Sequence, residues 1–426
     1  LAYSPGVATA SMLIAEQPAE AANLTARGNL VGVVTNGTAV LGLGAIGPLG
    51  AKPVMEGKAV LFKKFAGIDA FDIELDETDV DRLVDIVAAM EPTFGAINLE
   101  DIKAPECFEV ERRLRERMRI PVFHDDQHGT AIIVGAAIQN GLELLGKSLS
   151  EVRLVASGAG AAALACLDHL MAMGLRPENI TVVDIEGVVH EGREVLMDPY
   201  KEKFARKTEE RTLAEAVVGR DVFLGLSAPR ILTKDMVRTM AAKPMILALA
   251  NPVSEISPEE AREAAPDAII ATGRSDYPNQ VNNVICFPFI FRGALDVGAT
   301  TINREMMIAC TRAIADLVKT GAPETVAQAY GLSDLNFGPD CIIPKPFDPR
   351  LAVELPIAVA EAAMETGVAA RPILHMHAYR ERLSTRESGK DREGSARPVK
   401  RTAQVLWDYL VDTNKPSLGS AVKTKA

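Results

Sequence analysis

Two pairs of acidic residues stand out because each pair directly follows a short apolar run. Glu100 and Asp101 come after "AINL", and Asp125 and Asp126 come after "PVFH". If both runs are strands, the four carboxylates can converge at one edge of a sheet. Clustered carboxylates repel one another unless a cation neutralises them, and hard oxygen ligands without cysteine favour Mg²⁺ or Mn²⁺. The alternative interpretation is four unrelated surface acids at the starts of loops.

Basic side chains lie beside these acids and in the segment "VMEGKAVLFKKF". His124 and His128 flank the second acid pair, where they could bind a metal or support the loop through hydrogen bonds. Lys58 precedes a run that we expect to be a strand and is followed by Lys63 and Lys64. A lysine near a metal and other cations can have its pKa lowered enough to act as a base. The alternative for Lys58 is a solvated surface group.

Two glycine-rich stretches have the spacing of a dinucleotide-binding turn, Gly42-x-Gly44-x-x-Gly47 and Gly158-x-Gly160-x-x-Ala163. Such a turn needs a strand before it, a helix after it, and an acid at the end of the next strand to bind the adenosine ribose. The second stretch meets these conditions: "VRLVAS" precedes it, an alanine-rich helix follows it, and "ITVVD" ends in Asp184. The alternative is a glycine-rich connection without a ligand.

The first glycine stretch fits a cofactor less well. Pro48 and Pro53 interrupt the segment where a long helix should follow. Lys63 and Lys64 stand where the ribose-binding acid is expected. We therefore expect the first stretch to be a tight loop that brings backbone close to another part of the site, and the second to hold the cofactor.

The elements that would position these residues form an α/β chain. A length of 426 residues predicts two or three domains. Strand-like runs such as "DVFLGLS", "PMILALAN" and "AIIATG" alternate with helical patterns, which indicates βα units on a mostly parallel sheet. We expect an N-terminal α/β substrate and metal domain over 1–130, a Rossmann-like, doubly wound dinucleotide domain over 131–374, and a polar linker or tail over 375–426 with a possible helix at "TAQVLWDYLV".

Composition restricts the partners and the compartment. The net charge of −11 argues against binding to nucleic acid or to an anionic membrane, and no apolar run is long enough to cross a bilayer. The five cysteines contain no C-x-x-C pair, which favours buried thiols in a reducing cytoplasm over disulfides or zinc. The chain starts at Leu1 rather than at a methionine, so we expect that upstream residues are missing.

Seven ordered motifs, spread over residues 1 to about 374, resemble malic enzyme in its shorter bacterial form. They are "YSPGVA", "GKAVLFKKFAGID", "NLEDIKAPECF", "FHDDQHGTA", "ASGAGAAA", "ALANP" and "TGRSDYPNQVNN". The resemblance implies oxidative decarboxylation of L-malate to pyruvate and CO₂ with reduction of NAD or NADP, dependent on Mg²⁺ or Mn²⁺, in a homodimer or higher homo-oligomer.

The resemblance also assigns roles to individual residues. It makes Tyr3 the general acid, Lys58 the general base and Asp125 a carboxylate beside that lysine, and it makes Glu100, Asp101 and Asp126 the metal ligands. Asn251 and Asn283 match positions that touch substrate or nicotinamide, with Tyr3 and Lys58 also at the substrate. The expected cofactor residues are Gly158, Ala159, Gly160, Ala161, Asp184, Asn251 and Asn283.

Two features depart from longer members and related forms. Ala39 stands where longer members have an arginine for the substrate carboxylate, so backbone amides and the two asparagines must supply that contact. The segment from about His375 does not match the phosphotransacetylase-like region that follows in many short bacterial members.

The choice of cofactor and of reaction keeps its alternatives. Asp184 favours NAD because it accepts from a free ribose hydroxyl, whereas the resemblance and the nearby Arg193 favour NADP, towards which we lean. The alternatives to malate oxidation are a metal-dependent decarboxylating dehydrogenase of another 2-hydroxy acid and a non-catalytic dinucleotide-binding module.

Overall fold

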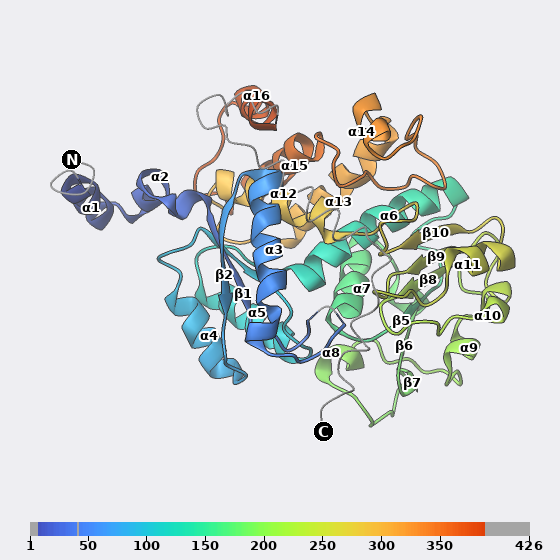
Figure 1. Ribbon diagram of the computed structural model, residues 1–426. Helices are drawn as coiled ribbons and strands as arrows, with labels where there is room; N and C mark the ends of the chain where they lie inside the picture. The colour runs from blue at the N-terminus through green and yellow to red at the C-terminus, as the bar shows by residue number, and fades with distance from the viewer. Residues whose placement is uncertain (1–6, 41, 388–426) are drawn as a thin grey trace, which may run out of the picture. The chain divides into compact units, whose positions relative to one another are not determined.

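The computed structural model describes residues 7–40 and 42–387. The chain divides after Arg380 into two compact units, and the following description concerns the first of them. This unit contains two separate β-sheets, one of four strands and one of six (Figure 1). Both sheets are built mainly from parallel strands, so the α/β class expected from the sequence is confirmed.

The first sheet has the strand order β2-β1-β3-β4 and is parallel throughout. Its strands are β1 (Leu30–Thr35), β2 (Asp69–Glu74), β3 (Ala96–Leu99) and β4 (Val122–His124). Leu99 and His124 are paired at the ends of β3 and β4. The two acid pairs therefore leave the sheet side by side at one edge, as the sequence predicted.

Helices cover both faces of this sheet. On one face, α4 (Val80–Ala89) and α5 (Glu106–Arg117) contribute to an apolar core that includes Val34 and Leu99. On the other lie α3 (Pro48–Ala66) and α12 (Phe287–Asp296), a helix that follows more than two hundred residues later in the chain. The Phe62 and Phe287 rings meet with centroids 4.8 Å apart.

The expectation that Pro48 and Pro53 prevent a helix, and that a strand follows Lys58, is wrong. Pro48 is the first residue of α3, where a helix needs no N–H donor, and the helix continues through Pro53. Its buried side chains recur at helical spacing: Ala51, Met55, Lys58, Phe62 and Ala66. Lys58 is therefore presented by a helix, on the face that packs against the protein interior.

The second sheet has the order β10-β9-β8-β5-β6-β7, and only β7 runs antiparallel. Its strands are β5 (Leu154–Ser157), β6 (Ile180–Asp184), β7 (Gly187–Val188), β8 (Val222–Gly225), β9 (Met245–Ala248) and β10 (Ile269–Thr272). The order reverses between β5 and β8, which is the position where doubly wound sheets bind their ligands. The predicted Rossmann-like sheet is confirmed.

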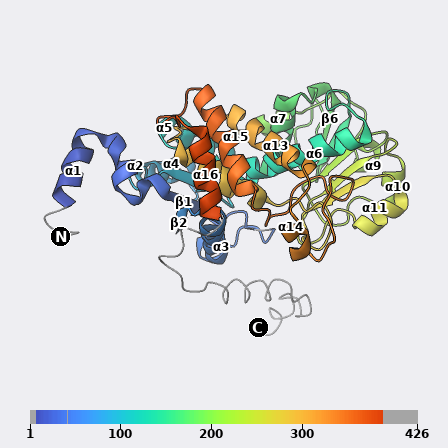
Figure 2. The same ribbon diagram turned by 90° about the horizontal axis from the view of Figure 1, so that it is seen from above.

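Three short helices, α9 (Leu213–Ala216), α10 (Lys234–Arg238) and α11 (Pro258–Ala264), share an apolar core with one face of this sheet. The longer helices α6 (Thr130–Leu145) and α7 (Ala161–Met173) lie beside the sheet (Figure 1), and α6 leads from the first sheet to the second. The helices α13 (Arg304–Lys319) and α15 (Leu351–Glu365) lie side by side (Figure 2).

The remaining helices are short or lie near the ends of the described chain. They are α1 (Val7–Glu16), α2 (Ala21–Leu24), α8 (Pro199–Glu202), α14 (Glu324–Ala329) and α16 (Met376–Glu387). Thus the first part of the expected polar tail is helical, and Tyr379 donates to Asp296 Oδ2 at 2.9 Å. The helix expected at "TAQVLWDYLV" falls outside the described residues. Among those that are described, no helix is long and apolar enough to cross a membrane.

Candidate active site

The centre of the site is a buried ammonium between two carboxylates. Lys58 Nζ on α3 lies 2.6 Å from Asp125 Oδ2 and 2.8 Å from Glu100 Oε1. The three residues are 9%, 0% and 5% exposed. The Phe287 ring of α12 also faces Lys58, with its centroid 4.1 Å from Nζ. Residues from three distant parts of the sequence therefore fix one lysine at the edge of the first sheet.

The charges of this cluster control its protonation. Burial on its own lowers the pKa of Lys58, but the negative charges of Asp125 and Glu100 outweigh burial and raise that pKa above its ordinary value. Burial raises the pKa of Glu100, and the charges of Asp126, Asp125 and Asp101 add to this against the opposing effect of Lys58. The sequence suggested that a metal and other cations would lower the pKa of Lys58. The carboxylates around Lys58 instead raise that pKa.

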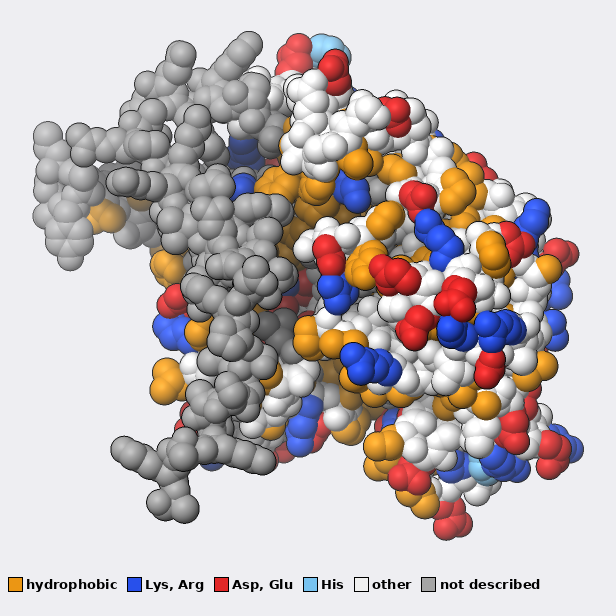
Figure 3. Space-filling model, turned by 45° about the vertical axis from the view of Figure 1, so that its right-hand side comes forward, with side chains coloured by type: hydrophobic (Ala, Val, Ile, Leu, Met, Phe, Trp, Pro, Cys, Tyr) orange, Lys and Arg blue, Asp and Glu red, His pale blue; other side chains and the backbone are white. Residues whose placement is uncertain are grey.

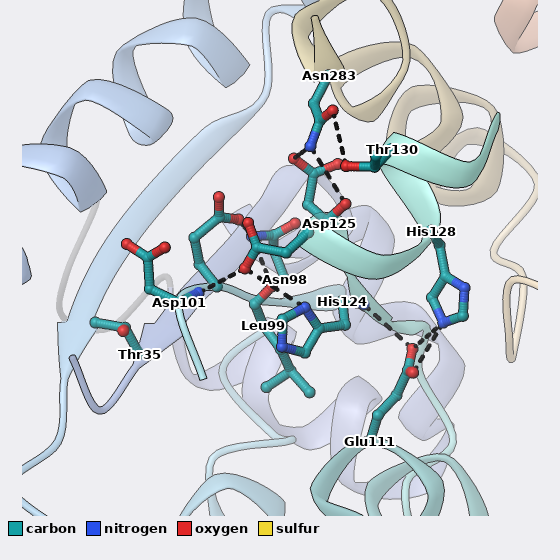
Figure 4. Close-up of polar contacts among 12 residues, drawn as sticks. Thr35, Asn98, Leu99, Asp101, Glu111, His124, Asp125, His128, Thr130 and Asn283 are labelled. Atoms are coloured by element: carbon teal, nitrogen blue, oxygen red, sulfur yellow. Dashed lines mark hydrogen bonds and ion pairs between the residues drawn. The ribbon is translucent and has the colours of Figure 1, made fainter. Parts of the chain in front are cut away.

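Asp125 begins a π-helical turn, η3 (Asp125–Gly129), that leads into α6. Turns of this kind are frequent at functional sites. Asn283 Nδ2 donates to Asp125 Oδ2 at 3.2 Å, and Thr130 Oγ1 donates to Asn283 Oδ1 at 3.2 Å (Figure 4). A Cβ at Gly129 would lie 1.9 Å from Asp125 Oδ1. Glycine is therefore required at this position to leave room for the carboxylate.

Asp101 and Asp126 are joined through the backbone. The Asp101 N–H donates to Asp126 Oδ2 at 2.7 Å, and the Asp101 carbonyl accepts from the Ala39 N–H at 3.0 Å. Asp101 has a φ of 54°, a left-handed conformation that is uncommon outside glycine and often marks functional sites. The structure thus holds the backbone after β3 against the start of η3.

The four acids are chemically suited to a divalent cation, since they offer only hard oxygen donors. Burial, with the repulsion from the other three acids, raises the pKa of Glu100. Within residues 7–40 and 42–387, however, no three acids, histidines or cysteines are gathered closely enough to hold a metal ion. Glu100 is turned towards Lys58 instead. A cation at Glu100, Asp101 and Asp126 therefore requires side-chain rotation, while the strands that carry these residues can stay in place.

His128 supports the turn through its ring, whereas neither ring nitrogen of His124 makes a hydrogen bond with a residue that the structure describes. His128 Nε2 lies 2.8 Å from both carboxylate oxygens of Glu111 on α5 (Figure 4), and Glu111 Oε1 accepts from the His124 N–H at 3.2 Å. The supporting interpretation of His128 is confirmed. The His124 ring is fully buried with Nδ1 3.7 Å from Asp126 Oδ2, and burial lowers its pKa.

Sequence reasoning missed Glu111, Asn98 and Phe287. Asn98 Nδ2 donates to Glu100 Oε2 at 2.8 Å and so orients that carboxylate. Asn98 interrupts the apolar run of β3, and a buried polar residue inside a strand is a signal that could have been used. Glu111 and Phe287 carry no such signal, because an acid on a helix and an aromatic residue in an apolar run are both ordinary.

The second glycine turn has the geometry expected of a cofactor turn. Gly158 follows β5 with a φ of +112°, and a Cβ there would lie 2.4 Å from the Leu226 carbonyl oxygen. Ala159 and Gly160 lead into α7, which begins at Ala161 with Gly160 as its N-terminal cap. A Cβ at Gly160 would meet nothing within 4 Å. The first turn of α7 is thus open to a phosphate group.

Asp184 ends β6, as predicted, and its charge is already compensated. Arg193 Nη2 lies 2.5 Å from Asp184 Oδ2, and Lys201 Nζ lies 3.1 Å from the same oxygen. Burial raises the pKa of Asp184, but the hydrogen bonds from Arg193, the Glu186 N–H and Lys201 outweigh it and lower that pKa. Two cations therefore surround the position where the adenosine ribose of a dinucleotide is expected.

The first glycine turn lies close to the loop after β9. Gly42, Gly44 and Gly47 all have positive φ, and a Cβ at Gly42 would lie 3.3 Å from the Asn251 carbonyl oxygen. Asn251 in turn covers Gly273, where a Cβ would lie 2.7 Å from Asn251 Nδ2. The tight loop expected from the sequence thus brings its backbone close to Asn251.

Glu255 connects two loops at this edge of the second sheet. It is fully buried, with Oε1 accepting from the Ser227 N–H and Oε2 from the Ala250 N–H, both at 3.0 Å. A Cβ at Gly225 would lie 2.5 Å from its carboxyl carbon. Glu255 therefore fixes the loop after β8 to the loop that carries Asn251. Tyr3, the expected general acid, falls outside the described residues.

Comparisons with known proteins show the family of the chain. Residues 1–115 match the family described as "Malic enzyme, N-terminal domain", and residues 127–331 match "Malic enzyme, NAD binding domain". The chain is 59% identical to an NAD-dependent malic enzyme of Rhizobium meliloti, over 98% of this chain and 57% of that protein. It is 55% identical to an NADP-dependent malic enzyme of Halomonas elongata, over 87% of this chain and 88% of that one.

A solved structure is also similar. The crystal structure of malic enzyme from Pyrococcus horikoshii matches with a TM-score of 0.84 and 41% identity, covering 96% of this chain and 92% of that chain. The chain spans about half the length of several curated relatives that it matches.

Proposed function

Because this chain belongs to the malic enzyme family, we propose that it catalyses the NAD(P)-dependent oxidative decarboxylation of L-malate to pyruvate and CO₂. The observation that carries the proposal is Lys58 fixed between Asp125 and Glu100. A buried lysine in contact with two acids is placed for proton transfer, and a module that only binds a dinucleotide needs no such group.

Lys58 must be in its neutral amine form when it takes the proton of the C2 hydroxyl of malate, and it becomes the ammonium group as that carbon is oxidised by NAD(P). Asp125 holds the ammonium group through its 2.6 Å contact, and Asn283 holds Asp125 in turn. The loss of CO₂ leaves an enolate, and Tyr3 protonates its C3 atom. These roles for Tyr3, Lys58 and Asp125 rest on the family resemblance together with the lysine geometry.

Glu100, Asp101 and Asp126 would hold Mg²⁺ or Mn²⁺. When bound, the cation supplies positive charge that stabilises the anionic oxygen at C2 of the substrate. With Glu100 engaged in this way, Lys58 would lose one of the two carboxylate contacts that raise its pKa. Rotation of Glu100 away from Lys58 is therefore part of the proposal.

The dinucleotide is proposed to lie on Gly158, Ala159, Gly160 and Ala161, with its nicotinamide near Asn251 and Asn283. We propose that NADP is preferred over NAD. The support is the pair of cations, Arg193 and Lys201, that neutralises Asp184 and so reduces its repulsion of a 2′-phosphate. One similar protein is named as NAD-dependent and another as NADP-dependent. Family membership alone therefore does not decide which cofactor is preferred.

We also propose a substrate domain over residues 1–130 and a dinucleotide domain over residues 131–374. The enzyme is proposed to be cytoplasmic and to form a homo-oligomer. All five cysteines are free and buried, which supports a reducing compartment. On the face shown in Figure 3, acidic and basic side chains are interspersed. The net charge of −11 supports the expectation that nucleic acid is not a partner.

The test is absorbance at 340 nm with purified protein, malate, Mn²⁺ and either NAD or NADP, with and without a chelator. We expect reduction of the cofactor and release of pyruvate only when metal and malate are both present. Turnover of tartrate or isocitrate in preference to malate would establish the alternative dehydrogenase. Dinucleotide binding without turnover of any of the three acids would establish the non-catalytic module.

A further inference from the structure

A cavity of about 860 Å³ lies between α5, α7, α8 and the start of α13. Its volume is typical of sites for small molecules. In the part of the chain that the structure describes, its wall contains none of the residues assigned above to metal, substrate or cofactor. Gln127 and His128 do line it, so it lies directly behind the turn that carries Asp125 and Asp126.

The charged side chains of the wall leave an excess of positive charge. Every acid of the wall already has a basic partner, and the pairs are Glu111–His128, Glu116–Arg112 and Asp168–Lys203. Three arginines then remain. Arg115 donates to the Ile302 carbonyl oxygen at 2.8 Å, whereas the side chains of Arg119 and Arg304 contact no acid or hydrogen-bond acceptor within the described ranges. A chain with a net charge of −11 thus has a cationic cavity.

A buried polar group in the wall also lacks a partner. Gln127 is 3% exposed, and its Nε2 makes no hydrogen bond with any residue that the structure describes. Buried donors are nearly always satisfied in native proteins, so an unpaired one calls for an explanation such as a bound water or ion. Because this atom is shielded from solvent, the Gln127 side chain must turn before a ligand in the cavity can reach it. Phe108 and Tyr200 add an apolar surface, with ring centroids 4.3 Å apart.

We propose that this cavity binds a small organic anion with several carboxylate or phosphate groups, and that its occupancy is transmitted to the catalytic turn η3. Arg115, Arg119 and Arg304 would supply the charge, because guanidinium groups match both anion types. The binding site is independent of the proposed malate reaction, and only the effect on catalysis rests on that function.

The path to the active site is short and consists of direct contacts. Gln127 follows Asp126 in the same π-helical turn. Glu111 contacts His128 through its carboxylate and the His124 backbone through Oε1. The charge of Arg115 acts on Glu111. An anion that attracts Arg115 away from Glu111 therefore acts on the carboxylate that holds His124 and His128, on either side of Asp125 and Asp126.

The binding test is isothermal titration calorimetry in metal-free buffer with two probes, pyrophosphate and propane-1,2,3-tricarboxylate. The two probes distinguish phosphate from carboxylate ligands. We expect at least one to bind, and we expect R119Q/R304Q to weaken that binding about a hundredfold, as the loss of two charge-assisted contacts implies. Arg262→Gln is the matched control, because Arg262 lies on α11, outside the wall, and carries the same charge; it should bind as the wild type does.

Equal binding by wild type and the double variant, or no binding of either probe, would overturn the proposal. So would a change in oligomeric state in place of a change in anion binding, since the arginines would then serve a contact between copies. Circular dichroism of the double variant checks that it is folded, which is expected because neither arginine side chain contacts an acid.

Hydrogen exchange tests the connection to η3. In the wild type we expect the bound probe to slow amide exchange over residues 125–129, and in R119Q/R304Q we expect no change. Binding without any change in these amides would overturn the transmission to the catalytic turn. This measurement uses no malate and no cofactor, so its result is separate from the outcome of the activity assay.

Discussion

Lys58 and Asp125 are separated by 67 residues in the sequence, yet Nζ and Oδ2 lie 2.6 Å apart in a buried part of the protein. Burying an ammonium group is unfavourable unless an anion accompanies it. The pair therefore fixes the helix α3 against the turn η3. It also places the lysine ammonium group at the edge where the four acids meet.

The first prediction concerns Lys58 as the base. Lys58→Ala should lower malate oxidation by about 10² to 10⁴-fold, the range for loss of a general acid or base, while dinucleotide binding stays nearly unchanged. Steady-state kinetics and a cofactor titration by fluorescence measure the two effects. The control is Lys63→Ala, because Lys63 is an exposed lysine on the same helix. This variant should be fully active. Equal losses of turnover and cofactor binding would argue against the role as base.

The second prediction concerns the metal. Asp126→Asn should abolish Mn²⁺ binding, measured by electron paramagnetic resonance, together with activity, because a neutral amide is a poorer ligand for a hard cation. Asp85→Asn on α4, an exposed acid paired with Arg117, provides the control. A variant at Asp126 that remained fully active in the presence of chelator would contradict the metal assignment.

The third prediction concerns Glu255 as a positioning residue. Glu255→Gln keeps one of the two backbone contacts and should raise KM for the dinucleotide about tenfold, since hydrogen bonds to charged groups contribute about 1.5–3 kcal/mol; Glu255→Ala should raise it further. Glu263→Gln, on the exposed side of α11, should leave KM unchanged. If the Glu255 variants lost only thermal stability, the residue would have a purely structural role.

The fourth prediction concerns cofactor choice. Arg193→Ala should lower kcat/KM for NADP relative to NAD by about tenfold, because Asp184 would regain negative charge beside the 2′-phosphate. Lys201 still contacts Asp184, so we expect some use of NADP to remain. Arg176→Ala, an exposed arginine before β6, should not alter the ratio. An unchanged ratio in Arg193→Ala would place 2′-phosphate recognition elsewhere.

The fifth prediction concerns stability against pH. Burial, with the charges of His128 and Arg304, lowers the pKa of His169 from 6.5 to about 4. Below pH 6.5 the unfolded chain therefore binds a proton at His169 that the folded protein does not. The free energy of unfolding decreases as the pH is lowered from 6.5 to about 4. The loss amounts to about 3 kcal/mol.

The variant His169→Gln retains a partner for Thr311, which His169 Nε2 contacts at 2.8 Å, and has no titrating ring. Its stability should fall less steeply between pH 6.5 and 4 than that of the wild type. Urea unfolding at several pH values measures both proteins. Parallel curves for the two proteins would show that His169 is protonated in the folded state.

The sequence predicted several strands correctly where a short apolar run is followed by an acid or a glycine. β3, β4, β5 and β6 all appear where expected, because buried parallel strands leave short continuous apolar runs. The same reasoning failed at α3. There the apolar residues of "AVLFKKF" belong to a helical stripe, and two prolines near the beginning of the helix concealed it.

The sequence motifs predicted the identity of several site residues, but not the contacts between residues of different motifs. The proximity of Lys58 to Asp125 follows from packing between α3 and η3, which no local pattern contains. The contacts of Phe287 and Glu111 with the site could not be predicted for the same reason. Each residue contacts the site from a helix that is distant in the sequence. The rotation of Glu100 towards Lys58 depends on the balance of charges in the folded protein.

The packing of α12 on α3 has a consequence for synthesis of the chain. Phe287 and Phe291 complete the surroundings of Phe62 and Lys58, although all the acids of the site lie before residue 130. When synthesis has reached only the end of the second sheet, the nascent chain still lacks Phe287 and Phe291, the aromatic residues that pack against Lys58 and Phe62. A fragment that ends after the first sheet should therefore be unable to assemble a working site, however well its own strands pair.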